Sequence, residues 1–540
     1  MSKELKFGPE AREQLSKGIK TLADAVTATL GPHGRNVVYE EGHEVRSTKD
    51  GVSVAKKVDL KDPIQNLGVR MAKQAAIKTA EDTGDGTTTA TLLAYEMVKE
   101  GLTALNNGEN AVEIKRNIDK AISSVVGTLR SKSSEEISSE KQLKQVATIS
   151  ANNDEEIGKL ITTAMDKVGN DGVVTNEESR TGETYLETVE GMQFDRGYKS
   201  PYFVTDNNTM TAVLDKPKVL VYNSKIAQVK ELLPLLENLS GQSKSLLIIA
   251  EDMDGEALAT LIVNKMRGTI KACVVKAPDF GERRTLIMED IAILTGGQVV
   301  DPDKGMKLSA LNSNWLGECR TATISKEQTT LVDGKGEVED IENRINQIQT
   351  HIENAKTPYE VEKLQERLSK FVGGVAIVHV GGNTETELKE KKDRVEDSLN
   401  ATKAAIEEGI VPGGGAALLY SREDIGNLDT VGGQIVYKAC VTPFLKILEN
   451  AGYDTLEGYG IATKLKDSGD NVWTGYDIKK EKILDLRKAG IIDPLKVTRS
   501  ALENAASIAG TILLTEAVMV DEKEEDKEPA NQLGGMGGMY

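Results

Sequence analysis

The hydrophobic pattern of this chain changes twice, and the resulting order of segments limits the folds available to it. Up to about residue 130, apolar residues recur at spacings of three and four, as at Leu15, Ile19 and Leu22, which is typical of amphipathic helices. Between about residues 172 and 380, short β-rich runs alternate with helical segments, which predicts a mixed α/β region. From there to about residue 520 the pattern is mostly helical again.

This order leaves two domain organisations open. The two helical ends could be separate domains, or they could be halves of one domain into which the α/β region is inserted. A chain of 540 residues is long enough for about three to five domains. The Ser/Glu-rich segment 131–140 indicates a boundary, and the charged, then Gly/Met-rich tail 521–540 is predicted to be disordered.

Composition and charge exclude several classes of protein. Lys and Arg number 67 against 85 Asp and Glu, and the net charge of −18 argues against a general binder of nucleic acid or of anionic membranes. The three cysteines are too few and too scattered for a disulfide framework or a zinc site, which fits a reducing compartment. No secretory signal and no membrane span are recognised, so we expect a cytoplasmic protein.

A loop of glycine, aspartate and threonine is the clearest candidate for chemistry. Gly84-Asp85-Gly86-Thr87-Thr88-Thr89 lies between two predicted helices, where glycines let backbone N–H groups approach a phosphate and a helix N-terminus favours anions. An aspartate in such a loop is suited to hold Mg²⁺. The alternative interpretation is a tight helix–helix turn capped by Asp and Thr, and the loop taken alone favours this turn.

Three further features are ambiguous when read alone. The segment Thr29–Asn36 could be a second phosphate-approaching loop or only the end of a helix. The run Gly413–Gly415 could allow close approach of a ligand or serve as a hinge. Asp397 falls within a predicted helix, where an aspartate usually lies on the solvated face.

Eight segments spread over the chain match one protein family. They are TLGPHGRNVV at 29–38, TKDGVSVAKKV at 48–58, GDGTTTAT at 84–91, TISAN at 148–152, RGYKSPYF at 196–203, EDMDGEALATLIVNKMRG at 251–268, RVEDSLNATKAAIEEGIVPGGG at 394–415, and the Gly-Gly-Met tail. Together they resemble a group I chaperonin of the GroEL family, and the resemblance runs from about residue 5 to the tail.

The resemblance implies a multidomain fold in which the middle of the chain is inserted. A mostly α-helical equatorial domain would comprise 1–132 and 408–520, and a small α/β intermediate domain 133–189 and 376–407. The α/β apical domain would comprise 190–375. Members of the family assemble as seven-membered rings, usually stacked in pairs. They bind unfolded client proteins, which ATP and a GroES-type co-chaperonin then enclose.

The same resemblance implies a nucleotide site for ATP and Mg²⁺, with K⁺ as a further candidate cation. Asp85 would be the Mg²⁺ ligand, Asp397 would help to activate the attacking water, and Asp50 would be a second catalytic residue. Asp477 would contact the adenine. The nucleotide contacts as a set would be Thr29, Leu30, Gly31, Pro32, Lys49, Asp85, Gly86, Thr87, Thr88, Thr89, Ile149, Ser150, Gly414, Asp477 and Asp493.

A second implied site is an exposed hydrophobic surface for client proteins. Its residues would be Tyr198, Tyr202, Phe203, Leu233, Leu236, Leu258, Ile262 and Val263. The helical pattern alone favours a different interpretation, in which these helices are simply well buried. Three positions depart from the family pattern, because His33 replaces a common Lys, Lys199 a usually apolar residue and Asp279 a usual Gly.

The sequence therefore predicts an ATP-driven folding machine. The alternative is a specialised ring-forming paralogue or scaffold with weak ATPase activity and a narrow range of clients. The presence of Asp50, Asp85 and Asp397 favours an active ATPase, while Lys199 leaves an altered choice of clients open.

Overall fold

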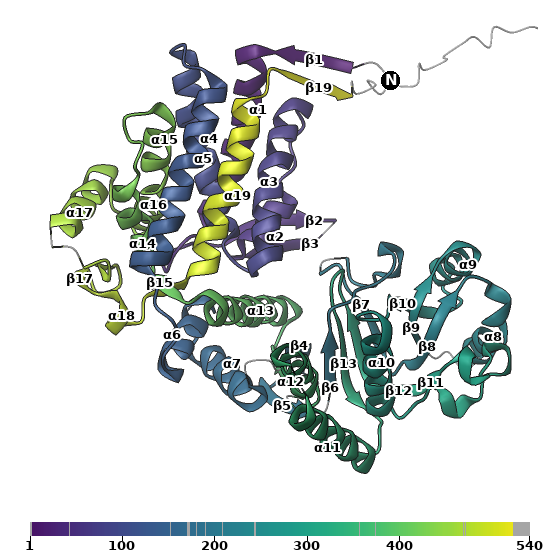
Figure 1. The fold of residues 1–540 in the computed structure, drawn as a ribbon. Coiled ribbons are helices and arrows are strands. Elements are labelled where there is room, and N and C mark those ends of the chain that lie inside the picture. Colours follow the sequence, from purple (N-terminus) through teal and green to yellow (C-terminus); the bar gives the residue numbers. More distant parts are fainter. Residues whose placement is uncertain are drawn as a thin grey trace, which may run out of the picture. The chain divides into compact units, whose positions relative to one another are not determined.

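The computed structural model describes residues 3–42, 44–151, 153–169, 173–179, 181–189, 191–207, 209–241, 245–355, 357–372, 374–467, 469 and 471–521. The chain forms two compact units (Figure 1). The first consists of Met1–Lys159 and Glu385–Tyr540, and the second of Leu160–Thr384. The two ends of the chain thus build one unit, and the middle is inserted between them. The finer division into three domains stays a prediction.

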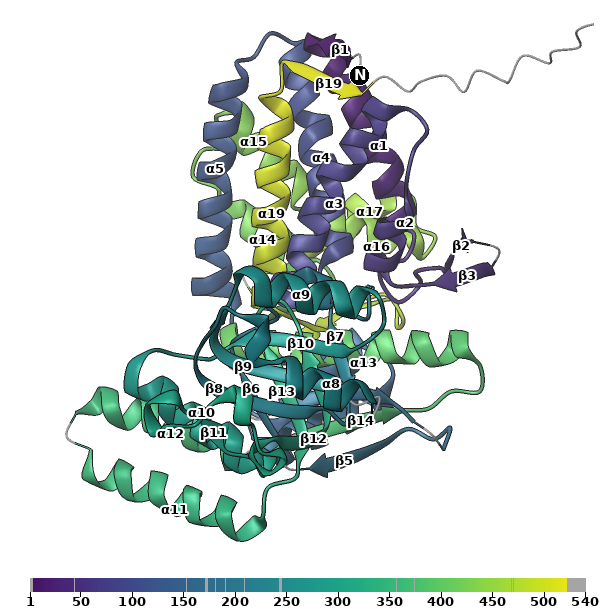
Figure 2. The same ribbon diagram turned by 90° about the vertical axis from the view of Figure 1, so that its right-hand side faces the viewer.

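The first unit is a bundle of long helices. Its helices are α1 (Gly8–Thr27), α2 (Gly51–Lys57), α3 (Pro63–Thr83), α4 (Thr87–Asn106), α5 (Ala111–Thr128), α6 (Glu140–Ser150), α13 (Glu385–Glu408), α14 (Ala416–Ser421), α15 (Val431–Ala439), α16 (Thr442–Asn450), α17 (Thr455–Asp467), α18 (Leu486–Ala489) and α19 (Leu495–Leu513). Helix α7 (Glu155–Val168) crosses from this unit into the second. In Figure 2 the late helix α19 lies among the early helices α3, α4 and α5, as residue contacts between these elements confirm. One apolar core, which includes Leu15, Leu93 and Leu502, joins the two ends of the chain.

Local signals explain where the long helices begin. The Asp62 side chain accepts hydrogen bonds from the backbone N–H groups of Ile64 and Gln65, and Pro63 occupies the first turn of α3. Asn110 caps α5 in the same way. Pro443 lies in the first turn of α16, where a missing backbone N–H is tolerated, and α15 ends before it.

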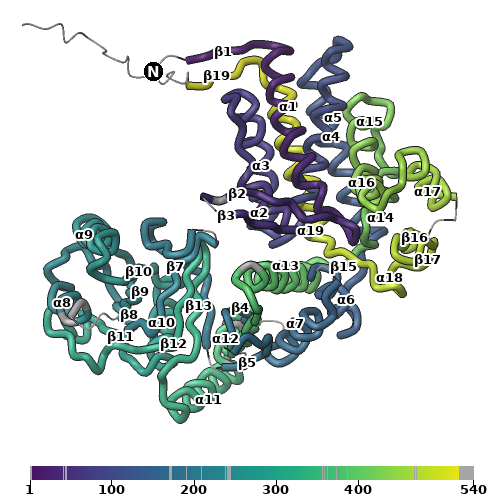
Figure 3. The backbone as a smooth tube through the Cα atoms, turned by 180° about the vertical axis from the view of Figure 1, so that it is seen from behind, coloured from purple at the N-terminus to yellow at the C-terminus, as the bar shows by residue number. Residues whose placement is uncertain are grey.

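Short strands complete the first unit, and most of them were not anticipated. Strands β2 (Val37–Glu41) and β3 (Glu44–Thr48) form an antiparallel pair, and further pairs lie in the region after residue 408, which was expected to be mostly helical. The additional antiparallel pairs are β1 (Lys3–Phe7) with β19 (Ala517–Asp521), β15 (Ile410–Pro412) with β18 (Ile492–Pro494), and β16 (Thr474–Asp477) with β17 (Lys482–Asp485). The β1–β19 pair ties the first strand of the chain to the last one described (Figure 3).

The second unit contains two sheets. In the smaller sheet β14 (Val375–Val380) pairs in parallel with β4 (Val173–Glu178) and antiparallel with β5 (Tyr185–Val189). The larger sheet has the order β10-β9-β8-β12-β13-β6, with β11 beside β8 and β7 beside β12. Its strands are β6 (Gly191–Phe194), β7 (Ala212–Asp215), β8 (Lys218–Ile226), β9 (Ser245–Met253), β10 (Lys271–Lys276), β11 (Val299–Val300), β12 (Gly317–Ile324) and β13 (Thr329–Gly334).

Parallel pairing explains the β-rich runs of the sequence. Strands β8, β9 and β10 pair in parallel, and the run from Leu246 to Ala250 in β9 is almost fully buried, as expected for a strand covered on both faces. The helices of this unit are α8 (Leu233–Gly241), α9 (Gly255–Met266), α10 (Gly281–Thr295), α11 (Val338–Asn354) and α12 (Pro358–Val372).

A buried ionic cluster fastens the α11–α12 hairpin to α10. Asp290 is 1 % exposed and accepts hydrogen bonds from Arg344 Nε at 2.8 Å and from Arg367 Nη2 at 2.7 Å. The Arg367 Nε group also donates to this carboxylate. Since one buried carboxylate serves two guanidinium groups, its removal would leave both charges without their main partner.

Three remaining sequence expectations can be placed. The predicted tail lies outside the described residues except for Asp521, which ends β19. In the described segments, no helix combines the length and apolar character needed to cross a membrane. Cys273, Cys319 and Cys440 are buried free thiols, and burial raises the pKa of each to about 12, which makes them unreactive near neutral pH.

Candidate functional site

A cavity of about 370 Å³ in the first unit gathers side chains from both ends of the chain. Every residue implied as a nucleotide contact lines it, and so do Asp50 and Asp397. In sequence order these are Thr29, Leu30, Gly31, Pro32, Lys49, Asp50, Asp85, Gly86, Thr87, Thr88, Thr89, Ile149, Ser150, Asp397, Gly414, Asp477 and Asp493. A volume of this size falls within the range of small-molecule sites.

The loop between α3 and α4 requires its two glycines. Gly84 and Gly86 have φ values of +70° and +86°, in the left-handed region that other residues rarely adopt. A Cβ atom at Gly84 would lie 2.1 Å from the Asn400 side chain, and one at Gly86 would lie 2.8 Å from Val497. The loop therefore packs its backbone closely against α13 and α19, which a larger residue would prevent.

The first turn of α4 offers hydrogen-bond donors to the cavity. The backbone N–H groups of Thr87, Thr88 and Thr89 have no acceptor within the helix, because they precede its first complete turn. The hydroxyls of Thr88 and Thr89 make no hydrogen bond to any residue that the structure describes. Together with the positive end of the helix dipole, these donors suit an anion such as a phosphate.

Asp85 places a carboxylate beside these donors. Its Oδ1 accepts a hydrogen bond from Gly86 N at 2.5 Å, and its Oδ2 accepts one from Ser150 Oγ at 3.0 Å. Burial is the main cause that raises the pKa of this carboxyl, with a smaller contribution from the charge of Asp50. Within the described chain Asp85 has no ion-pair partner, so a cation bound there would offset the cost of burying its charge.

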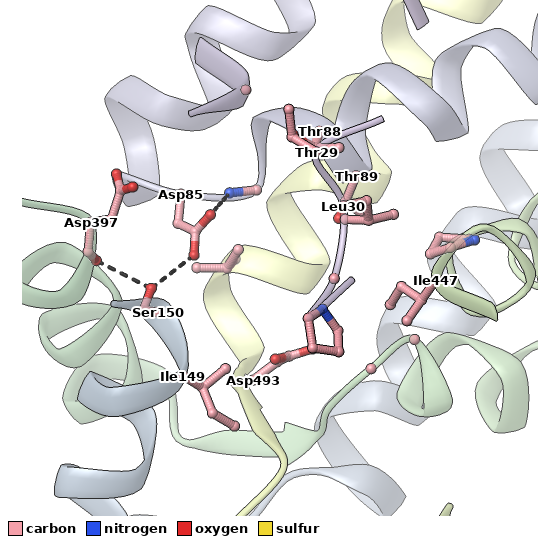
Figure 4. Close-up of a pocket in the computed structure, with 18 of the residues that line it drawn as sticks. Thr29, Leu30, Asp85, Thr88, Thr89, Ile149, Ser150, Asp397, Ile447 and Asp493 are labelled. Atoms are coloured by element: carbon pink, nitrogen blue, oxygen red, sulfur yellow. Dashed lines mark hydrogen bonds between the residues drawn. The ribbon is translucent and has the colours of Figure 1, made fainter. Parts of the chain in front are cut away.

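Helix α13 brings a second carboxylate, that of Asp397, to the same end of the cavity (Figure 4). Ser150 Oγ lies 3.4 Å from the Asp397 backbone oxygen, and Ser398 Oγ donates to Ala147 O at 2.8 Å, so α6 holds α13 in place. The Asp397 carboxylate accepts no hydrogen bond from the described residues. Burial, followed by the charges of Asp50 and Asp85, raises its pKa well above the ordinary value for an aspartate.

Asp50 has a structural task at the edge of the cavity. Its carboxylate caps α2 by accepting hydrogen bonds from Val52 N at 3.0 Å and Ser53 N at 2.7 Å. The cap holds the charge of Asp50 in a fixed position, from which it acts on Asp85 and Asp397. Its predicted catalytic role stays a prediction.

The opposite end of the cavity is apolar. Figure 4 shows Ile447 far from the carboxylates of Asp85 and Asp397, with Leu30 between them. The loop that carries Leu30 is fixed by Asn450 Nδ2, which donates to the backbone oxygens of Thr27 and Leu30 at 2.9 Å each. A ligand with an anionic end and a flat apolar end would match this division.

Asp477 and Asp493 line the cavity in different ways. Asp477 Oδ1 accepts hydrogen bonds from the backbone N–H groups of Lys479 at 3.0 Å and Lys480 at 3.3 Å, so its carboxylate shapes the turn between β16 and β17. Asp493 lies on β18. Burial raises the pKa of its carboxyl to about 7, and the charge of Asp85 makes a smaller contribution.

Sequence reasoning missed several residues that line the cavity. Phe444 and Ile447 on α16 form part of the apolar end, and no motif marks them. Asp393 also lines the cavity, and it could have been found because it precedes Asp397 by four residues, which places both on one face of a helix.

Comparison with known proteins identifies the family. The model of the TCP-1/cpn60 chaperonin family matches residues 22–523. The chain belongs to this family. A solved structure of the chaperonin gp146 from the bacteriophage EL 2 (Pseudomonas aeruginosa), crystallised in the presence of ATP-BeFx, is similar with a TM-score of 0.69 and 22 % sequence identity. The match covers 96 % of this chain and 99 % of that chain, so the expected multidomain chaperonin fold is confirmed.

The residues implied as a client surface of this chaperonin lie in the second unit, and two of them are not exposed. Tyr202, Leu233 and Val263 are exposed, at 61 %, 41 % and 44 % respectively. Phe203 is 0 % and Leu236 8 % exposed, so the expectation that these two belong to an exposed surface is wrong for this structure. The remaining three residues, Tyr198, Leu258 and Ile262, are partly buried and pack against the core.

The geometry of the chain explains both corrections. Phe203 closes a short 3-10 turn, Pro201–Phe203, which directs its ring into the core of the unit. On α8, Leu236 joins Leu235 and Leu239 on the buried face, while Leu233 lies outside it. Helical periodicity allows either face to be the buried one, and the neighbouring strands decide which one is.

Two departures of this chaperonin from the family pattern have local explanations. Lys199 Nζ lies 2.6 Å from Asp252 Oδ1, so its charge is paired. Asp279 has a φ of +62°, which explains why the family usually has glycine there. Its Oδ1 accepts a hydrogen bond from Phe280 N at 2.8 Å, and this bond stabilises the unusual conformation. His33 is exposed, and the structure gives no reason for its replacing a lysine.

Proposed function

We propose that this chaperonin is a group I member that hydrolyses ATP with Mg²⁺ and uses the reaction to capture and enclose unfolded proteins. The observation that carries the proposal is the cavity itself. One end combines the N-terminus of α4 with Asp85 and with the unpartnered carboxylate of Asp397, and the other end is apolar. Phosphoryl transfer needs positioning and charge neutralisation more than covalent help from the protein, and this arrangement provides for both.

The residues present fit a nucleotide and one divalent cation. Thr87, Thr88 and Thr89 would hold the phosphates through N–H and hydroxyl donors. Asp85 would hold Mg²⁺, since its carboxylate is buried without an ion-pair partner among the described residues. When bound, Mg²⁺ supplies positive charge that neutralises the phosphate oxygens. K⁺ remains a further candidate cation.

Asp397 would accept the proton of the attacking water. The water oxygen forms a bond to the γ-phosphorus, the bond between that phosphorus and the bridging oxygen breaks, and the electron pair stays on ADP. The proton lost by the water passes to the Asp397 carboxylate. Its raised pKa, caused first by burial, makes it a better proton acceptor than an exposed aspartate.

The assembly and its partners are proposed from the resemblance to the GroEL family. We expect seven-membered rings, stacked in pairs, in the cytoplasm, and a GroES-type co-chaperonin that competes with unfolded proteins for the apical surface. Tyr202, Leu233 and Val263 support this surface because exposed apolar side chains on a large particle mark binding sites. Native mass measurement should give a multiple of seven subunits, and a stable monomer would contradict this part of the proposal.

Two substitutions test the proposed chemistry. Asp397→Ala should keep ATP binding and lower kcat by about 10²–10⁴-fold, the usual contribution of a general base. Asp85→Ala should instead weaken binding of Mg-ATP. Glu396→Ala is the matched control, because this neighbour of Asp397 is an exposed acid on the same helix and does not line the cavity. Turnover at the wild-type rate in both test variants would refute the assignment.

A further inference from the structure

Helix α13 presents two carboxylates to the cavity. Asp393 and Asp397 both line it, and residues four positions apart on a helix lie on the same face one turn from each other. Glu396, between them in sequence, is exposed and does not line the cavity. The second carboxylate, that of Asp393, has no part in the chemistry described so far.

Asp393 is partly buried and has no partner. Its carboxylate makes no hydrogen bond or ion pair with the residues that the structure describes. The cation next to it in sequence, Arg394, is already engaged, because it lies 2.5 Å from Glu390 Oε1 and 3.9 Å from Asp154 Oδ2. A partly buried acid without a partner costs free energy, and such groups gather at sites where a protein exchanges protons.

The charges around Asp393 come from its own helix and from three loops of the first unit. Burial and then the charge of Asp50 raise its pKa to about 7, while Lys389 and Lys392 act against this rise. On its own helix, the charged groups within four residues are Lys389, Glu390, Lys391, Lys392, Arg394, Glu396 and Asp397, and Lys391 is paired with Glu387. The charged groups of the cavity wall nearby are Lys49, Asp50 and Asp85, and Asp154 follows α6. The cations of α19, Lys496 and Arg499, pair with Glu407 and Glu408 at the far end of α13.

We propose that Asp393 receives, from Asp397, the proton that ATP hydrolysis releases and passes it to solvent. The inference rests on the proposed ATPase activity and assigns to this chaperonin a proton exit along one face of α13. It follows from the shared face of the two residues, from their common place in the cavity wall, and from the lack of any partner for either carboxylate in the described chain.

The transfer balances without a further reactant. After the water oxygen has bonded to the γ-phosphorus, Asp397 carries the proton as a neutral carboxylic acid. The O–H bond at Asp397 breaks, an O–H bond forms at Asp393, and Asp397 is again a carboxylate for the next turnover. Asp393 then releases the proton to bulk water. Asp393 therefore acts through Asp397 and does not touch the nucleotide.

The test is the pH dependence of hydrolysis by the full-length protein. In the wild type, kcat should rise with pH through about 7, because Asp393 must be a carboxylate to accept the proton. Asp393→Asn keeps the shape of the side chain but removes the acceptor, so kcat at neutral pH should fall by about tenfold or more, and the part of the rise that belongs to Asp393 should disappear. KM for ATP should stay unchanged, because the residue does not hold the nucleotide. Asp393→Glu should retain most of the activity and the rise.

Two controls separate the possible results. Glu396→Gln makes the same chemical change on the solvent side of α13 and should leave the profile unchanged. ATP binding by Asp393→Asn, measured directly, shows that the variant is folded. If the wild type does not hydrolyse ATP, the proposed function is refuted and this inference with it. If the wild type is active and Asp393→Asn keeps its kcat and its pH profile, only the proton exit is refuted.

Discussion

One buried and one exposed aliphatic residue of the second unit give a quantitative test of the proposed client surface. Leu236 and Val263 were both implied as client contacts, yet the first is 8 % and the second 44 % exposed. We therefore expect Leu236→Ser to lower the stability of the unit. We expect Val263→Ser to reduce the capture of clients and to leave the stability nearly unchanged.

The expected energies follow from the buried carbon atoms. Leu236→Ser removes three carbons that are almost fully buried, which at about 0.8 kcal/mol per carbon amounts to roughly 2 kcal/mol. The cavity left behind and the buried hydroxyl add to this, so a total of about 3–5 kcal/mol is expected. Val263→Ser removes two carbons that are about half exposed, which should cost less than about 1 kcal/mol.

The assay combines denaturant unfolding with capture of a chemically denatured test protein. Leu236→Ser should lower the unfolding midpoint of the second unit strongly, and Val263→Ser should leave it nearly unchanged. Val263→Ser should nevertheless reduce capture, since an exposed apolar contact is lost. An unchanged midpoint for Leu236→Ser would refute the burial argument, and full capture by Val263→Ser would remove Val263 from the client surface.

Three further expectations rest on other parts of the structure. Asp290→Ala should destabilise the second unit by about 3–5 kcal/mol in urea unfolding, because it leaves the buried Arg367 guanidinium without its carboxylate partner and removes one of the two carboxylates that pair with Arg344. Glu289→Ala, at the more exposed partner of Arg344, should cost about 1 kcal/mol or less. Gly86→Ala should abolish ATP binding measured by calorimetry, since φ is +86° and the new Cβ would lie 2.8 Å from Val497. Burial raises the folded-state pKa of Asp493 to about 7, so the folded chain keeps a proton that the unfolded chain releases above about pH 4. Stability of the nucleotide-free protein should therefore fall as pH rises from about 4 to 7, and Asp493→Asn should flatten this dependence in urea unfolding.

The long helices and the buried strands could be predicted because their signals are local. Asp62-Pro63 and Asn110 begin α3 and α5 through signals that depend on neighbouring residues only. The apolar run of β9 is likewise recognisable from composition. Strands β1 and β19 were missed because each is stabilised by a partner at the other end of the chain, which no local pattern reveals.

In the cavity, too, residues with a local sequence signal could be predicted, whereas residues placed there by tertiary packing could not. The loop Gly84–Thr89 could be found from its residue types, since glycine and threonine are required for the turn and for the helix start. Phe444 and Ile447 could not, because apolar side chains acquire a role in the cavity only through the packing of α16 against the loop at Leu30. Leu236 illustrates the reverse error, in which a resemblance implied exposure and packing on the sheet buried the side chain.

Helix α13 also suggests how the proposed hydrolysis and the proposed client handling are connected. The chain returns from the second unit to the first between Thr384 and Glu385, so α13 is the first element after that junction. Ser150 links the same helix to the loop that carries Asp85, because its hydroxyl contacts both the Asp85 carboxylate and the Asp397 backbone oxygen. Any rearrangement that shifts α13 would therefore withdraw Asp397 and Asp393 from the cavity together, while the loop at Asp85 stays with α4. With the proposed role of Asp397, nucleotide would then bind without being hydrolysed, and hydrolysis would begin only when α13 returns, as in enzymes whose catalytic group is supplied by a moving element.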